Sequence, residues 1–164
     1  MRYFGSGHRA SETTVSNPSA TKAFTRKENV EVFEKAGVFT EREMKSRYEI
    51  AMEDYTAKVE IEGNTALEIA RTQILPAVRA EYLETLKAYN ETDASDVKVA
   101  IDALHDETAA LGKGLVELRA GIKALQEAVA AADPAAVLAK MGALRTVADG
   151  LETVVSDARV DERV

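Results

Sequence analysis

The amino-acid sequence predicts an all-α protein, an antiparallel helical bundle. Ala, Leu, Val, Glu and Lys dominate the 164 residues, aromatic residues make up only 5% and Trp is absent, a bias typical of long helices packed through aliphatic contacts. A helical pattern runs through about residues 40–89, and a heptad pattern follows it. We therefore expect one long bent helix at about 40–89, packed with a heptad-patterned helical hairpin (about 96–132 and 134–155) and a short N-terminal helix (about 22–36).

Three segments are expected along the chain. Residues 1–21 mix Gly, Ser, Thr, Asn and Pro without periodicity, which predicts a flexible leader. Residues 156–164 are polar and charged with nothing to bury, which predicts a disordered tail. The helical bundle domain is expected at 22–155, a length that can bury a core without disulfides or metals.

Composition narrows the possible partners and location. The chain has 28 acidic and 21 basic residues, and its formal charge of −7 has the wrong sign for holding phosphate backbones, so we expect no nucleic acid. The absence of Cys excludes disulfides and thiol catalysis and fits a reducing cytoplasm. No apolar run approaches the roughly 20 residues that span a bilayer. The sequence predicts a cytoplasmic protein without a membrane partner.

The N-terminal helix and the start of the long helix carry clear end signals. Gly37 follows the apolar pattern of the first helix where a left-handed stop is expected. Thr40 is a good N-cap, Glu43 completes a capping box with it, and Phe39 is placed to pack on Met44. The start of the long helix is therefore well specified.

Two apolar stripes follow each other along the long helix, and two residues within it predict local irregularities. Gly63 predicts either a local break or the close approach of another backbone. Pro76 predicts a bend near Thr72 to Leu75, because it removes a backbone donor and clashes with the preceding turn. The stripes consist of Met44, Tyr48, Ala51, Tyr55 and Val59, and of Leu67, Ala70, Ile74, Val78, Tyr82 and Leu86.

The hairpin shows the strongest periodicity. Gly112, Gly114 and Gly121 weaken its first helix, so we expect that helix to owe its order to a partner helix. Asp133 and Pro134 supply an N-cap and a first helical residue for an antiparallel return. Core positions spaced by four and three are Val97, Ile101, Leu104, Thr108, Leu111, Leu115, Leu118, Ile122, Leu125, Val129 and Ala132, followed by Val137, Met141, Leu144, Ala148, Leu151 and Val155.

The sequence offers no catalytic, cofactor-binding or metal-binding residues. His105 has Asp102 three residues before it, a single pair that we interpret as a partly solvated position at the edge of the heptad pattern. A dense charged run on the first third of the long helix is either a solvated face or an interface. Our interface candidates are Arg47, Tyr48, Tyr55 and Arg71.

Two segments resemble a known family. KENVEVFEKAGVFTEREMKSRYEI (27–50) and VEIEGNTALEIARTQILPAV (59–78) are similar, in order and spacing, to the C-terminal helical region of type III glutamine synthetases. MGALRTVADGLETVV (141–155) resembles the closing helix of that region. The resemblance covers about residues 22–155, and at Gly63 the family more often carries Ala.

The resemblance implies the C-terminal domain of a glutamate–ammonia ligase. In that family the full enzyme uses ATP and a divalent metal such as Mg²⁺ and forms large rings, whereas the motifs of its catalytic domain are not found in residues 1–26. The expected role is therefore non-catalytic: packing on the catalytic domain and subunit assembly, with self-association of the chain. The alternative is a free-standing coiled-coil module for protein–protein interaction, suggested by the heptad pattern.

Overall fold

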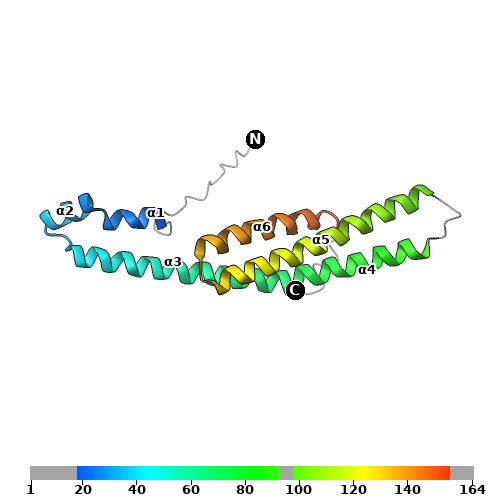
Figure 1. The fold of residues 1–164 in the computed structure, drawn as a ribbon, viewed down its shortest axis with the longest axis horizontal. Coiled ribbons are helices and arrows are strands. Elements are labelled where there is room, and N and C mark those ends of the chain that lie inside the picture. Colours follow the sequence, from blue (N-terminus) through cyan, green and yellow to red (C-terminus); the bar gives the residue numbers. More distant parts are fainter. Residues whose placement is uncertain (1–17, 93–97, 156–164) are drawn as a thin grey trace, which may run out of the picture. The chain divides into compact units, whose positions relative to one another are not determined.

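The computed structural model describes residues 18–92 and 98–155, and within these ranges every regular element is helical (Figure 1). The all-α prediction is confirmed. The chain divides into two compact units, Met1–Lys58 (the first unit) and Val59–Val164 (the second unit), with the boundary inside the long helix. The elements are α1 (Pro18–Thr21), the 3₁₀ turn η2 (Lys22–Thr25), α2 (Lys27–Lys35), α3 (Glu41–Ile69), the π-helical turn η3 (Ala70–Ile74), α4 (Leu75–Glu91), α5 (Lys98–Ala130) and α6 (Pro134–Glu152).

The short N-terminal helix differs from its prediction. Instead of one helix over 22–36, the 3₁₀ turn η2 leads into an extended residue, Arg26, with φ −69° and ψ 134°, before α2 begins. The Asn29 side chain donates to the Ala23 carbonyl at 2.7 Å, a bond that spans this break. Structure also begins before Lys22, because α1 lies within the segment predicted as a leader. The leader at 1–17 and the tail at 156–164 lie outside the described residues.

The long helix leaves α-helical geometry at the predicted place. The π-helical turn η3 separates α3 from α4, and the Leu75 N–H donates to the Ala70 carbonyl, five residues back. Pro76 follows directly and has no N–H to give to the α-helical ladder. A wider turn before a proline removes the clash between its ring and the preceding carbonyl, which explains why the irregularity lies here.

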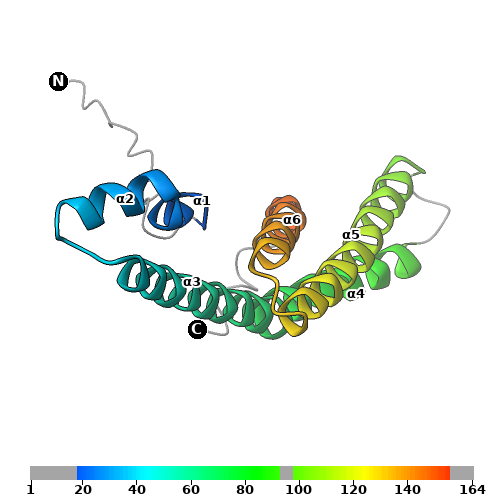
Figure 2. The ribbon, with the colours of Figure 1, turned by 60° about the vertical axis from the view of Figure 1, so that its left-hand side comes forward.

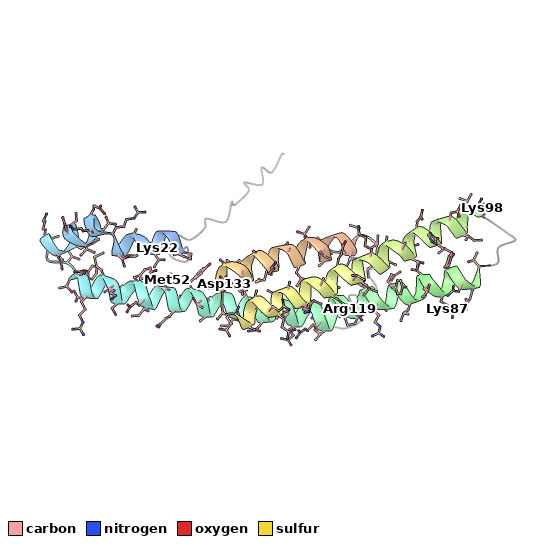
Figure 3. All side chains as sticks on the ribbon, viewed as in Figure 1. Lys22, Met52, Lys87, Lys98, Arg119 and Asp133 are labelled. Carbon is pink, nitrogen blue, oxygen red and sulfur yellow. The ribbon has the colours of Figure 1, made fainter. Side chains whose placement is uncertain are left out.

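The second unit is an antiparallel arrangement of α4, α5 and α6 (Figures 1 and 2). Lys87 near the end of α4 and Lys98 at the start of α5 lie at the same end of the α4–α5 pair. Asp133 lies at the opposite end of α5, where α6 begins (Figure 3). The Asp133 carboxylate accepts from the N–H groups of Ala135 and Ala136 at 3.0 and 3.3 Å. The predicted hairpin and its N-cap are confirmed.

Most of the predicted heptad residues contribute to the core of the second unit, but Ala132 is exposed in the turn after α5, and Val97 lies outside the described residues. Leu111, Leu118 and Leu125 are each 0% exposed, and on α6 the heptad positions Val137, Leu144 and Leu151 are buried. The glycines of α5 explain how the helices approach so closely. A Cβ at Gly121 would lie 3.0 Å from Leu144 Cδ1, and a Cβ at Gly114 would overlap the Leu151 side chain. These glycines weaken the helix alone and admit the leucines of α6.

Gly63 lies at a close approach inside an unbroken helix. A Cβ there would lie 2.8 Å from Val137 Cγ1 and 3.0 Å from Val129 Cγ2. Neither predicted explanation holds as stated, because α3 is continuous here and two valine side chains, not a backbone, lie against the glycine. No helix of the described residues is long and apolar enough to cross a membrane.

Candidate functional site

The first unit presents its candidate surface on α3, and two local motifs fix where that helix begins. Gly37 has φ +67° and ends α2: its N–H donates to Glu34 and the Val38 N–H donates to Phe33, both at 3.0 Å. This is a Schellman motif, in which a left-handed residue satisfies the last carbonyls of a helix. The predicted left-handed stop is confirmed.

The predicted capping box is also confirmed. The Glu43 N–H donates to Thr40 Oγ1 at 3.3 Å, and the Thr40 N–H donates to Glu43 Oε2 at 2.8 Å. The Thr40 hydroxyl donates to the same carboxylate oxygen at 2.8 Å. The bond from the Thr40 backbone, then the bond from its hydroxyl, and the nearby charge of Arg47 together hold the pKa of Glu43 below its ordinary value of 4.5. The charged form of Glu43 is thus the one that caps α3.

An aromatic pair orients Arg47. The guanidinium carbon of Arg47 lies 4.4 Å from the centre of the Phe39 ring, a cation–π contact, and Phe39 lies 5.8 Å from the Phe33 ring. The sequence predicts Phe39 beside Met44 and gives no indication of the contact with Arg47. Arg47 is exposed, so its other face remains open to solvent.

The apolar stripe of α3 in the first unit is only partly covered. Met44 is 1% exposed, whereas Tyr48, Ala51 and Tyr55 are half-buried. Ile50 on the same helix is 62% exposed, and Val32 on α2 is 64% exposed. Amphipathic helices of globular proteins bury such stripes against another element. The stripe around Tyr48 and Tyr55, which we name the α3 face, is therefore a candidate docking surface.

The fourth interface candidate belongs to the second unit. Arg71 lies in the π-helical turn, and its Nη2 donates to the side-chain oxygen of Gln126 on α5 at 2.5 Å. This bond ties the irregular turn to the neighbouring helix. Three candidates thus lie together on α3 in the first unit, whereas Arg71 serves a contact within the second unit.

The described residues contain no candidate metal-binding cluster. Residues 18–92 and 98–155 hold no group of three His, Cys, Asp or Glu side chains that could bind a metal ion. The His105 side chain is 64% exposed, with its Nδ1 3.4 Å from the Asp106 carboxylate and its ring 5.9 Å from that of Tyr89. The carboxylate beside His105 is therefore that of Asp106, the next residue in the sequence.

Comparison with known proteins decides the family. The profile of the glutamine synthetase C-terminal domain matches residues 6–92. The chain belongs to the glutamine synthetase C-terminal domain family. A glutamine synthetase of Butyrivibrio fibrisolvens is 29% identical over 142 residues, which cover 79% of this chain and 20% of the relative. The chain thus spans about a fifth of the length of that relative.

The matched region includes the candidate docking surface. Residues 6–92 contain α1 to α4, and so the whole α3 face with Arg47, Tyr48 and Tyr55. The alignment with the Butyrivibrio fibrisolvens enzyme is longer than this region. No solved structure is significantly similar to the chain.

Proposed function

We propose that this chain is the non-catalytic C-terminal helical domain of a type III glutamine synthetase, and that it packs on the catalytic part of that enzyme and supports subunit assembly. The parent reaction is the ATP-dependent ligation of glutamate and ammonia. The observation that carries this proposal is the α3 face, an apolar stripe left half-covered within the region that matches the family.

The described residues of the first unit leave the α3 face without a full cover. The first unit supplies one almost fully buried apolar residue, Met44, among its described residues, so its own elements do not complete a core. The aligned relative is about five times longer than the segment that it shares with this chain. We assign the cover to the rest of such an enzyme, with Tyr48 and Tyr55 packing their rings and keeping their hydroxyls at the rim.

Charged groups would position this contact. Arg47, held against Phe39, can pair with an acidic group of the partner, since a pre-oriented guanidinium loses less freedom on binding. Arg71 is retained as an interface candidate, with Gln126 fixing its orientation. ATP and Mg²⁺ are assigned to the catalytic part alone, and the location of the enzyme to the cytoplasm.

A chimeric enzyme tests the proposal. The segment of the Butyrivibrio fibrisolvens glutamine synthetase that aligns with this chain is replaced by the chain, and a deletion variant of the same enzyme simply lacks that segment. We expect the chimera to assemble and to form glutamine, and the deletion variant to lose assembly. A deletion variant with full assembly and activity would refute the role in packing and assembly.

Two further arms sharpen this test. Tyr48→Glu in the chimera should impair assembly, whereas Ser46→Glu, at an exposed position of the same helix, should not. The isolated chain, given glutamate, ammonia, ATP and Mg²⁺, should form no glutamine above background. Glutamine formation by the chain alone would overturn the non-catalytic assignment.

The alternative function, a free-standing coiled-coil module, has lost its main support. The buried heptad residues of α5 and α6 pack on one another within the second unit, so this pattern does not call for a partner chain.

A further inference from the structure

The contacts between α4 and α5 keep a constant register. The Tyr89 ring lies 5.9 Å from the His105 ring. One stretch further along, a Cβ at Gly112 would lie 3.3 Å from Tyr82 Cε2, so this tyrosine packs against the glycine. Seven residues separate the two tyrosines, and seven separate their partners on α5. Equal spacing on both helices is what two regular antiparallel α-helices require.

This equality is lost across the π-helical turn η3. On α3, a Cβ at Gly63 would lie 3.0 Å from Cγ2 of Val129 on α5. Nineteen residues separate Gly63 from Tyr82, whereas seventeen separate Gly112 from Val129. The helix formed by α3, η3 and α4 therefore holds surplus residues over the same stretch of α5. Between these contacts, η3 is where that helix departs from α-helical geometry.

The geometry of η3 takes up one residue of the surplus. The Leu75 N–H donates to the Ala70 carbonyl, five residues back, so the turn closes with one residue more than an α-helical turn. The remaining residue corresponds to a rise of about 1.5 Å, which the side chains at these contacts can span. Residues on both sides of the turn are buried: Leu67 and Ala70 before it are 6% and 1% exposed, and Val78 after it is 2% exposed.

Two features hold the wide turn in its place. Arg71 lies within η3, and its Nη2 donates to the side-chain oxygen of Gln126 on α5. Pro76 follows the turn and has no N–H to give to the Thr72 carbonyl, four residues back. A shift of the wide turn along the helix would therefore break the bond between Arg71 and Gln126.

We propose that η3 is a register adapter, a wide turn that stores one residue so that the helix residues before and after it contact the α5–α6 hairpin in phase. The bond from Arg71 to Gln126 holds this turn in position. Each residue rotates an α-helix by about 100°, so a residue lost outside the turn rotates one buried stripe away from the core. The adapter lies wholly within the second unit, so it does not depend on a partner of the α3 face.

Two matched deletions test the register. Thr72 in η3 and Thr65 in α3 are both exposed, and the hydroxyl of each donates to the carbonyl four residues back. Deletion of Thr72 from the full chain should convert η3 to an α-helical turn and leave the midpoint of thermal unfolding unchanged or higher. Deletion of Thr65 should lower the midpoint by at least about 5 °C, because buried residues on one side of the deletion leave the core. Insertion of an alanine after Gln73 should also lower it, since the turn already holds its extra residue.

Hydrogen exchange tests the role of Arg71. Arg71→Ala should speed the exchange of the η3 amides roughly threefold or more, because a hydrogen bond from a charged group is lost. Arg79→Ala removes another exposed arginine of the same unit, on α4, and is the matched control. Exchange in η3 should be unchanged in that variant.

Equal losses on deletion of Thr72 and of Thr65 would overturn the proposal, and a failure to fold counts as such a loss. A chain that tolerates both deletions would overturn it as well, because the register would then be unspecified. Equal exchange in Arg71→Ala and Arg79→Ala would contradict the role of Arg71. These measurements need no partner, so their outcome is independent of the chimera experiment.

Discussion

The two units of this chain are held by different kinds of interaction. In the second unit, α5 buries Leu111, Leu118 and Leu125 completely, and α6 contributes Leu144 and Leu151 to the same core. In the first unit, the described contacts are local: a left-handed glycine, a capping box and an aromatic pair beside an arginine. Helices need packing of an apolar face for most of their stability. The second unit thus has a core of its own, and the difference fits the proposal that a partner completes the first unit.

Truncation of large apolar side chains should give the largest difference in stability loss between the two units. Leu118→Ala removes a side chain that is 0% exposed and should lower the free energy of unfolding by about 2–5 kcal/mol, because a cavity remains. Ile50→Ala, at a side chain that is 62% exposed in the first unit, should change it by less than about 0.5 kcal/mol. Urea unfolding followed by circular dichroism measures both. Similar losses for the two variants would contradict the contrast.

Adding a methyl group where two helices approach closely should destabilise the protein less than core truncation does. Gly114→Ala places a methyl group against Leu151, and overpacking of about 1–3 kcal/mol should outweigh a gain of about 1 kcal/mol in helix propensity. The midpoint of thermal unfolding should therefore fall. Gly150→Ala, in open space, should raise it at concentrations where the chain is monomeric. If Gly114→Ala also raised the midpoint, close packing of α5 on α6 would be disproved.

Substitutions at the two residues with left-handed backbone conformation should change stability in opposite directions in the two units. Gly37 ends α2 with φ +67°, and Ala132 follows α5 with φ 52°, a conformation that costs a residue with a Cβ roughly 1 kcal/mol. Gly37→Ala should destabilise the first unit by about that amount, whereas Ala132→Gly should stabilise the second. Hydrogen exchange of α2 and of α5 reports the two effects separately. The same sign for both would argue against these backbone conformations.

The capping box should give the smallest effect, visible as a pH dependence. The pKa of Glu43 is lowered in the folded chain, so its contribution is present above its ordinary value of 4.5 and is lost as pH falls through the lower folded value. Protection of the first turn of α3 should therefore decrease on acidification. In Glu43→Gln this pH dependence should be absent, because Gln keeps a hydrogen-bonding side chain without the titration. An unchanged pH profile in that variant would rule out Glu43 as the source.

Most of the fold could be predicted, because its signals are local or periodic. Thr40 with Glu43, Gly37, Asp133 and Pro76 each act within a few residues, so their letters suffice. The heptad spacing likewise predicts which face of α5 is buried. The break at Arg26 could not be predicted, because it depends on a bond from Asn29 to Ala23 that competes with a continuous helix.

The candidate site could be predicted only in part. Tyr48 and Tyr55 follow from their spacing on one stripe, and the half-covered state of that stripe needs the structure. The partners of Arg47 and Arg71, Phe39 and Gln126, depend on side-chain geometry and, for Arg71, on a contact 55 residues away in sequence. No sequence period links such pairs.

Hydrogen exchange of the isolated chain, and of the chain within the chimeric enzyme, tests the central claim most directly. In the isolated chain, amides of α2 and of α3 up to Lys58 should exchange much faster than those of α5 between Leu111 and Leu125. Within the assembled chimera, the slow exchange should extend to the α3 face around Tyr48 and Tyr55. Equal protection of both units in the isolated chain, with no change on assembly, would contradict the account.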